Sequence, residues 1–394
     1  MELKRLGDII KITSGGTPLT SKREYYDDGK IPWAKTGDLK VRHLSKIPDS
    51  ISQLGLDNSS AKIFPINTVL IAMYGATIGN CSILKTSAAT NQACAALLPN
   101  EEVNEEFLFF FLSSIKSELI KKGVGGGQPN ISATILKDIK IPFPSLTDQI
   151  RIAQILTQAE NLITQRKESI SLLDELLKST FLEMFGDPSF NQNKFPQGKI
   201  RDVVYEVKYG TGKPAEINGI YPYLRMNNIT SNGYMDFSTL KYINLEKNEE
   251  PKYLVKKGDL LFNRTNSKEL VGKTGIYNET SQMVIAGYLI RVRTNEKANP
   301  WFLWGYLNSL HGKKTLFSMC KSIVGMANIN AQELQEIKIV IPPIELQNQF
   351  AAIVEKVETV KSEYQASLTE LENMYGVLSQ KAFKGELKVE LENV

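Results

Sequence analysis

The feature that most constrains this chain is an internal repeat, in which one stretch of sequence recurs 198 residues later. The first copy, from Gly125, reads GGGQPNISATILKDIKIPFPSLTDQIRIAQIL; the second, from Val324, reads VGMANINAQELQEIKIVIPPIELQNQFAAIV. Without any gap, the shift aligns Asn130 with Asn328 and Gln149 with Gln347. A repeat of this length predicts a duplicated domain rather than a solenoid of short repeats.

Both copies have the same layout: a polar, Gly-containing loop, a short IKI strand, a proline and a long helix. Pro144 and Pro342 suit the position just before a helix, where a missing N–H costs nothing. We therefore expect two versions of one design. The predicted parts are a first globular domain (1–144), a first spacer helix (145–185), a second globular domain (186–342) and a second spacer helix with the C-terminal tail (343–387).

Each globular part is predicted to be a mixed α/β domain. Short β-branched runs are separated by Gly, Asn and Pro, which is typical of a twisted sheet. Each domain then has a helix rich in aromatic residues, EEFLFFFLSSIKSELIKK and NPWFLWGYLNSLHGKK, which we expect to face the core. The fold class is α+β, and the loops differ between the two halves more than the frame does.

The two long segments show heptad periodicity, which predicts coiled-coil helices. The apolar positions of the first are Leu156, Ile163, Ile170 and Leu177. Those of the second are Ile353, Val357, Val360, Tyr364, Leu371, Met374 and Leu378, with the polar Ser367 inside the seam. Antiparallel pairing would give the monomer a pseudo-two-fold axis. The alternative is two amphipathic helices, each lying on its own globule.

Charge is distributed unevenly along the chain. Residues 186–342 carry 21 Lys and Arg against 14 Asp and Glu, and residues 1–144 carry 17 against 14. The helical stretch 145–185 carries four against six. Basic globules indicate contact with a polyanion, and mildly acidic helices indicate spacers or protein-binding faces.

Composition and cysteine use limit the class of protein. The chain has 394 residues, of which 42% are hydrophobic and 23% charged, as in soluble globular proteins of two to three domains. It contains no apolar run long enough to span a membrane, and its first residues do not resemble a signal peptide. Three cysteines without paired spacing and only two histidines argue against zinc sites and disulfides, and predict a cytoplasmic protein.

Catalytic motifs are incomplete. The segment ELVGKTG resembles a phosphate loop, but Ser267 stands where the first glycine is required. GVGGGQPN follows a helical segment rather than a strand, so the geometry of a nucleotide-binding turn is missing. IPPIE lacks the polar opener and the aromatic residue of an amino-methyltransferase tetrapeptide. Scattered acidic residues leave a carboxylate nuclease site open, but nothing clusters in both halves. We expect a non-catalytic chain that holds no metal.

Polar, basic, Gly-containing loops remain as candidates for binding. Arg, Lys, Asn, Thr and Tyr are side chains that contact base edges and phosphates. The predicted DNA-binding residues are Lys22, Arg23, Lys35, Arg42, Tyr74, Thr77, Lys208, Tyr209, Lys213, Arg225, Asn227, Asn228, Asn263, Arg264, Asn266 and Lys268.

This organisation resembles the specificity subunit of type I restriction-modification systems. The similar segments are IPFPSLTDQIRIAQIL, IVIPPIELQNQFAAIV, KGDLLFNRTNS, LEMFGD and LSQKAFKGEL. The first junction departs slightly, with Ser145 in place of a second proline and Asp148 before Gln149. The resemblance covers nearly the whole chain.

The resemblance implies an adaptor. Each globule would be a target-recognition domain that reads one half of a split double-stranded DNA sequence. The helices would hold the domains apart and dock two DNA adenine methyltransferase subunits, which bind S-adenosylmethionine, and restriction subunits can join them. No cofactor would bind this chain, because base flipping and methyl transfer belong to the partner.

Two alternatives come from other classes. A stand-alone DNA-modifying enzyme, either a methyltransferase or a nuclease, would need catalytic motifs that this chain lacks. A duplicated coiled-coil scaffold without a DNA role would explain the helices but not the basic globules with their different loops.

Overall fold

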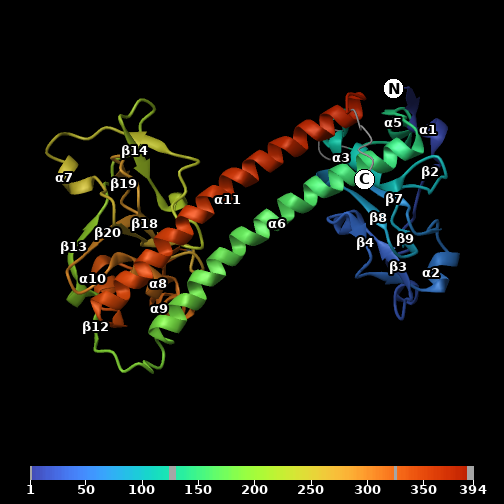
Figure 1. Cartoon of the computed structure of the whole chain (residues 1–394). Coiled ribbons are helices and arrows are strands. Elements are labelled where there is room, and N and C mark those ends of the chain that lie inside the picture. Colours follow the sequence, from blue (N-terminus) through green and yellow to red (C-terminus); the bar gives the residue numbers. More distant parts are fainter. Residues whose placement is uncertain (1, 124–129, 324–325, 388–394) are drawn as a thin grey trace. The chain divides into compact units, whose positions relative to one another are not determined.

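The chain folds into two compact units that share two long helices. A computed structural model describes residues 2–123, 130–323 and 326–387, so the glycines of the loop GVGGGQPN from residue 124 to 129 lie outside the described residues. Unit 1 comprises residues 1–166 and 367–394, and unit 2 comprises residues 167–366. Helices α6 (Leu146–Phe185) and α11 (Ile344–Lys384) each contribute one half to each unit (Figure 1).

Unit 1 is built on two small sheets. The first has the order β2-β10-β7-β8-β4 and the second β5-β3-β9-β6. Their strands are β2 (Ile12–Ser14), β3 (Ile31–Ala34), β4 (His43–Leu44), β5 (Ser50–Ile51), β6 (Ile63–Phe64), β7 (Val69–Ala72), β8 (Cys81–Leu84), β9 (Ala88–Thr90) and β10 (Cys94–Leu97). Every residue of β7, β8, β9 and β10 is buried. Strands covered on both faces read as continuous apolar runs, which explains their sequences.

Short elements complete unit 1. They are β1 (Leu3–Arg5), α1 (Leu6–Ile9), η1 (Arg23–Tyr25), η2 (Thr36–Asp38), α2 (Gln53–Asp57), η3 (Gly75–Thr77), α3 (Glu105–Ser114), α4 (Lys116–Lys122), α5 (Ala133–Lys137) and β11 (Lys140–Pro142). Helix α3 is buried on all sides from Phe107 to Leu112, in one core with β7, α6 and the end of α11. A helix that is apolar all round must lie inside the fold, as the aromatic run predicted.

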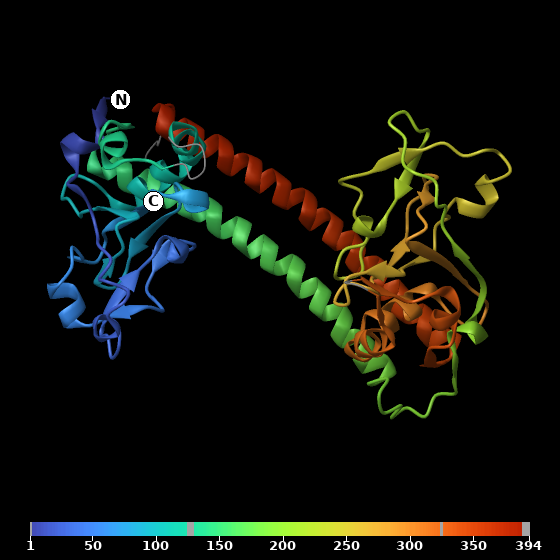
Figure 2. The same cartoon turned by 180° about the vertical axis from the view of Figure 1, so that it is seen from behind.

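Unit 2 repeats this design. Its sheets have the orders β13-β20-β16-β18, β15-β14-β19 and β17-β22-β21. The strands are β12 (Gln197–Lys199), β13 (Val204–Tyr209), β14 (Tyr221–Leu224), β15 (Lys241–Ile243), β16 (Asp259–Asn263), β17 (Thr265–Asn266), β18 (Thr274–Tyr277), β19 (Val284–Ile285), β20 (Leu289–Thr294), β21 (Lys321–Ile323), β22 (Met326–Asn328) and β23 (Lys338–Val340). The helices are η4 (Ile200–Val203), η5 (Met226–Asn228), α7 (Glu250–Tyr253), α8 (Pro300–Asn308), α9 (Leu310–Met319) and α10 (Ala331–Gln335). Figure 2 shows the same elements from behind.

The repeat in the sequence is a repeat in topology. Order β2-β10-β7-β8 in unit 1 corresponds to β13-β20-β16-β18 in unit 2, and the parallel pair β3–β9 corresponds to β14–β19. The IKI strands β11 and β23 each pair antiparallel with the first strand of their own unit. Elements α5, β11 and α6 begin 198 residues before α10, β23 and α11.

The long helices pack together within each unit. In unit 2, Lys361 Nζ lies 2.5 Å from Asp174 Oδ1, and the Phe181 and Phe350 rings are 5.5 Å apart. The later residue on α6, Phe181, contacts the earlier residue on α11, Phe350. The two helices therefore run antiparallel within unit 2. In unit 1 the Tyr375 hydroxyl donates to Glu160 Oε1 at 3.4 Å. The predicted mixed α/β class with two paired long helices is confirmed, and the alternative of separate surface helices is wrong.

One predicted position of the helix seam is wrong. Met374 is 42% exposed, whereas Leu368 is buried and Tyr375 is half-buried against the core of unit 1. The seam continues through Tyr364, Leu368, Leu371 and Tyr375, because alternating steps of four and three residues keep one face of a helix towards its partner. The predicted heptad therefore placed this position at Met374, one residue before Tyr375, which the structure places against the core.

Candidate nucleic-acid interface

The predicted loops are attached to the strands that both units repeat, which form a common backbone frame. In unit 1, Gly16 N–H donates to Thr90 O at 2.9 Å; in unit 2, Thr211 N–H donates to Ile285 O at 2.9 Å. A Cβ on the preceding Gly15 would lie 2.0 Å from Thr90 O, and one on Gly210 would lie 2.2 Å from Ile285 O. These glycines therefore allow a close approach to the protein's own strands, and they fix the point from which each loop starts.

Arg264 lies at the edge of this frame in unit 2, directly after β16. Its guanidinium carbon is 4.7 Å from the centre of the Tyr209 ring, and its Nη2 donates to Asn328 Oδ1 at 3.4 Å. Its backbone N–H donates to Tyr288 O at 3.0 Å. Tyr209 and Tyr288 are 40% and 52% exposed. A guanidinium held between one exposed aromatic ring and an amide is well placed to contact nucleic acid.

Arg225 opens the short turn η5. Its backbone N–H donates to Asn228 Oδ1 at 2.8 Å, and its Nη2 donates to Thr239 O at 3.2 Å. Asn227 is exposed, whereas Asn228 is buried and donates to Asp236 O at 2.8 Å. Asn228 therefore shapes the turn, and Asn227 and Arg225 lie on it.

Tyr223 lies two residues before Arg225, and its hydroxyl donates to Thr211 O and to Lys213 O, each at 2.9 Å. Burial raises the pKa of Tyr223, the charge of Arg225 opposes that change, and Tyr288 adds to it.

Lys273, from the segment ELVGKTG, contacts the backbone of the turn η5. Its Nζ donates to Met226 O at 2.9 Å and to Ile229 O at 2.5 Å. Burial lowers the pKa of this amine. The lysine is thus engaged by carbonyls at both ends of η5 and holds the turn that carries Arg225 and Asn227.

The remaining candidates in unit 2 have mixed surroundings. Lys208 and Lys213 are exposed and form ion pairs at 2.7 Å with Glu206 and Glu249. Lys268 lies 4.3 Å from the centre of the Phe317 ring, and Asn266 Oδ1 accepts the N–H of Ser267 at 2.9 Å. Asn263 is buried, with Oδ1 accepting the N–H of Thr265 at 3.4 Å.

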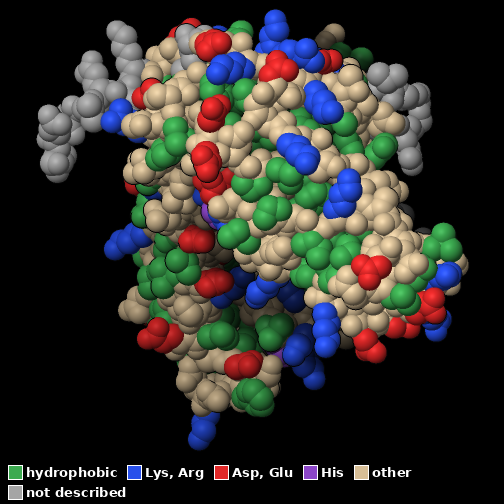
Figure 3. All heavy atoms as spheres, turned by 90° about the vertical axis from the view of Figure 1, so that its right-hand side faces the viewer, with side chains coloured by type: hydrophobic (Ala, Val, Ile, Leu, Met, Phe, Trp, Pro, Cys, Tyr) green, Lys and Arg blue, Asp and Glu red, His purple; other side chains and the backbone are tan. Residues whose placement is uncertain are grey.

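Candidates of unit 1 are spread over several loops. Lys22 Nζ lies 3.2 Å from the Tyr25 hydroxyl, and the next residue, Arg23, is exposed. Lys35 Nζ forms an ion pair with Asp49 at 2.8 Å. Tyr74 is 43% exposed, and the hydroxyl of Thr77 donates to its carbonyl at 3.0 Å. On the face in Figure 3, Lys and Arg side chains are spread out with Asp and Glu among them.

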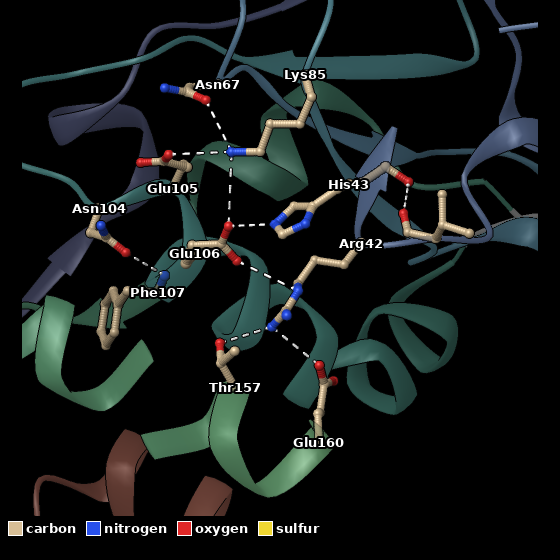
Figure 4. A network of polar contacts seen from close by, with 12 residues as sticks. Arg42, His43, Asn67, Lys85, Asn104, Glu105, Glu106, Phe107, Thr157 and Glu160 are labelled. Carbon is tan, nitrogen blue, oxygen red and sulfur yellow. Dashed lines mark hydrogen bonds and ion pairs between the residues drawn. The ribbon is translucent and has the colours of Figure 1, made fainter. Parts of the chain in front are cut away.

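Arg42 points into the protein (Figure 4). Its Nη1 donates to Thr157 Oγ1 at 2.9 Å and lies 3.2 Å from Glu160 Oε2, both on α6. Its Nε lies 3.7 Å from Glu106 Oε2 on α3, and the other oxygen of that carboxylate, Oε1, lies 2.6 Å from His43 Nε2. Arg42 therefore connects the start of β4 to helices α3 and α6, and its guanidinium contacts the protein itself.

Some residues that lie beside the candidates were not singled out from the sequence. Tyr288 and Asn328 border Arg264, and in unit 1 the Thr17 hydroxyl contacts Gln92. The register of the repeat could have indicated Asn328, since the same shift aligns it with Asn130. Nothing in the sequence indicated Tyr288, because only the fold brings it beside Arg264.

The described residues were also searched for reactive thiols, metal sites and membrane-spanning helices. The thiols of Cys81 and Cys94 are buried, and burial raises the pKa of each to about 12. Within the described ranges, no group of three His, Cys, Asp or Glu is arranged to hold a metal ion. No helix in the same part of the chain is long and apolar enough to cross a membrane.

Comparison with known proteins adds the family. The family described as type I restriction modification DNA specificity domain matches residues 1–172 and 200–373. The specificity subunit of type I restriction enzyme MjaIX from Methanocaldococcus jannaschii is 26% identical, over 99% of this chain and 94% of that protein. The EcoKI specificity subunit from Escherichia coli K12 is 22% identical, over 97% and 89%.

The fold has a solved counterpart. The S subunit of a type I restriction-modification system from M. genitalium superposes with a TM-score of 0.57, at 17% identity, over 97% of this chain and 96% of that one. With two family matches, one in each half, the alternatives of a stand-alone enzyme and of a scaffold are set aside. The chain belongs to the type I restriction-modification DNA specificity family, as a non-catalytic specificity subunit with two target-recognition domains.

Proposed function

We propose that each unit reads one half of a split double-stranded DNA target. The observation that carries this proposal is a pair of equivalent positions, Met73 in unit 1 and Arg264 in unit 2. Met73 N–H donates to Ala93 O at 2.8 Å, as Arg264 N–H donates to Tyr288 O. One backbone position thus bears a buried apolar side chain in one unit and a guanidinium in the other. Different side chains on one frame are what two readers of different sequences need.

The residues that we propose to contact DNA are those whose side chains remain at the surface. They are Lys22, Arg23, Lys35, Tyr74, Thr77, Lys208, Tyr209, Lys213, Arg225, Asn227, Arg264, Asn266 and Lys268. We assign the other three candidates, Arg42, Asn228 and Asn263, to positioning, since their contacts lie within the protein. Lysines paired with one carboxylate can exchange it for a phosphate, because both offer anionic oxygens.

The proposed division of the chain follows its repeat. Residues 1–144 and 186–342 would be the recognition domains, and residues 145–185 and 343–387 the spacers that dock partner subunits. The proposed partners are two DNA adenine methyltransferase subunits, with restriction subunits in complete assemblies. S-adenosylmethionine would bind in the methyltransferase, and the complex would act in the cytoplasm, where bacterial and archaeal DNA lies.

A domain exchange tests this proposal. Residues 186–342 are replaced with the corresponding segment of a related subunit, and the chain is expressed with its methyltransferase partner. Sequencing of methylated adenines should show one half of the target changed and the other half unchanged. The matched control exchanges residues 1–144 and should alter the opposite half. If either exchange changed both halves together, the two units would not be independent readers.

A further inference from the structure

Unit 2 contains a cavity of about 450 Å³ that is lined by residues from the last turns of α6 and from α8 and α9. Its floor is apolar and consists of Leu177, Phe181, Trp304 and Phe350, all buried. Leu182 and Leu310 at its mouth are 47% and 74% exposed. Cavities of this size accommodate small organic molecules.

The floor of the cavity is fixed in place. The Phe181 ring stacks on Phe302 at 6.0 Å, and the Trp304 indole N–H donates to Gly233 O at 2.7 Å. Residue 305 must be glycine, because a Cβ there would lie 2.5 Å from Phe181 Cδ2. The cavity is therefore formed before any ligand arrives, which lowers the entropic cost of binding.

Lys313 is one of the residues that line the cavity. Its side chain is half-buried, and its Nζ lies 3.5 Å from Gly272 O, a long contact for an ammonium. Burial, with a smaller contribution from the charge of Lys273, lowers the pKa of Lys313 to about 8. The amine carries a positive charge below that pH. Lys178 and Lys314 line the same cavity.

The acidic groups on the wall are already engaged. Asp174 accepts from Lys361 Nζ at 2.5 Å and from Asn232 Nδ2 at 3.1 Å. Asp187 accepts the N–H of Ser189 at 2.8 Å, and the Ser189 hydroxyl lies 3.0 Å from His311 Nδ1. The cavity therefore combines an apolar floor with three lysines on its wall, beside two carboxylates that already have partners.

We propose that this cavity binds a small amphipathic anion, with an aromatic or branched apolar body on the floor and a carboxylate against Lys313. Duplex DNA offers anionic oxygens to Lys313. It offers no apolar group to the floor of the cavity, because its bases are stacked and paired. A neutral apolar molecule would leave Lys313 desolvated without a partner, which is unfavourable. A ligand with both parts satisfies both features of the site.

The test uses a pair of isosteric probes, naphthylacetate and naphthylacetamide, with the full-length chain and calorimetry. Naphthylacetate should bind with one site per chain, and at least about tenfold more tightly than the neutral amide, as a charge-assisted contact allows. Lys313→Met should remove that preference, whereas Lys313→Arg should keep it. The matched control, Lys241→Met, changes an exposed lysine of β15 outside the cavity and should bind as the wild type does.

Equal affinity for the two probes, or an unchanged preference in Lys313→Met, would overturn the proposal. So would displacement of naphthylacetate by a short DNA duplex, since the cations would then serve phosphates. If Lys313→Met does not fold, Leu182→Asp replaces it, because it adds a negative charge at the exposed mouth. That variant should weaken naphthylacetate binding about tenfold and leave the amide unaffected.

Discussion

Gln149 and Gln347 make the same three hydrogen bonds, each within its own unit. In unit 1, Gln149 Oε1 accepts the backbone N–H of Asn104 at 2.9 Å. Its Nε2 donates to Glu102 O at 3.0 Å and to Pro144 O at 3.2 Å. Asn104 is the residue that caps α3, so this amide in the first turn of α6 fixes the start of the aromatic helix.

The second copy repeats the arrangement in unit 2. Gln347 Oε1 accepts the N–H of Asn299 at 2.9 Å, and Nε2 donates to Lys297 O at 3.1 Å and Pro342 O at 2.7 Å. Both glutamine side chains are completely buried. The two long helices are thus joined to their recognition domains by one repeated clamp.

Removing the clamp should destabilise unit 2. Gln347→Leu leaves one backbone N–H and two carbonyls buried without partners, so we expect a loss of about 2–4 kcal/mol in the free energy of unfolding. The measurement is urea unfolding followed by tryptophan fluorescence in a Trp33→Phe background. Of the three tryptophans, this background keeps Trp301 and Trp304, both in unit 2.

The matched control for Gln347→Leu is Gln332→Leu. Gln332 lies on α10 of the same unit, and its side chain is exposed. This change should alter the free energy of unfolding by no more than about 0.5 kcal/mol. Equal losses in the two variants would show that the hydrogen bonds of the clamp contribute nothing specific.

The sequence predicted the frame well, because the repeat constrains two copies at once. The shift of 198 residues located α6 and α11 and the strands β11 and β23. It also aligned Gln149 with Gln347, although it could not show that these amides are buried, since glutamine is usually exposed on a helix. A backbone pattern is encoded locally, whereas the partner of a side chain depends on the whole fold.

Candidate site residues illustrate this limit. Arg42 and Arg264 are both arginines next to a predicted polar loop, and from the sequence alone they are equivalent candidates. The structure turns Arg42 towards Thr157 and Glu160, and leaves Arg264 beside the exposed Tyr209. Asn227 and Asn228 are adjacent, yet only the first is exposed. Residue type therefore predicted the kind of surface, but not the direction of each side chain.

Arg264 is the most informative single position for recognition. Arg264→Met places in unit 2 the residue that unit 1 has at the equivalent position, Met73, so the backbone should tolerate it. We expect binding to the half-site of unit 2 to weaken by about 1–3 kcal/mol if the guanidinium contacts a base edge. The other half-site should be read as before.

The measurement for Arg264→Met is binding of the assembled complex to duplexes that differ in one half-site at a time. A loss of similar size on every duplex would indicate a phosphate contact instead. Wild-type affinity and unchanged discrimination would remove Arg264 from the interface. Lys241→Ala serves as the control for simple loss of a positive charge in the same unit.

The stability of unit 2 should depend on pH through Glu206. Burial acts to raise the pKa of Glu206, but hydrogen bonds from Lys208 and Arg291 and the charges of Arg291 and Arg293 outweigh it, so the pKa is lowered. The ionised carboxylate therefore stabilises the folded state above its unfolded pKa of about 4.3, and this contribution is lost as the pH falls through the lower folded value.

Glu206→Gln tests this dependence in the same Trp33→Phe background. The variant should be less stable than its parent at pH 7, and the difference in the free energy of unfolding should shrink steadily below about pH 5. Glu216→Gln is a suitable control, because Glu216 lies on the surface of unit 2 and contacts Asn244 rather than an arginine. A difference that stays constant down to pH 3.5 would contradict the role of Glu206.

The long helices should set the spacing between the two half-sites. Each unit contains one half of α6 and one half of α11, so residues inserted at the junctions lengthen both helices between the halves. The facing contacts of Glu160 with Tyr375 and of Asp174 with Lys361 put these junctions near residues 165–169 and 366–370. Four residues add about 6 Å and slightly more than one turn. Along B-DNA this corresponds to about two base pairs at 3.4 Å each.

The predicted outcome is a target with the same two half-sites and a longer gap. Two residues inserted in each helix serve as the matched control, because they rotate the following half-helix by about 200° and should abolish methylation. Sequencing of methylated adenines from cells that express each variant with its partner measures both the half-sites and the gap. An unchanged gap in the four-residue variant would mean that contacts other than these helices determine the spacing. Equal activity of the two variants would mean that the helices are flexible connections, and the antiparallel packing inside each unit makes that result unexpected.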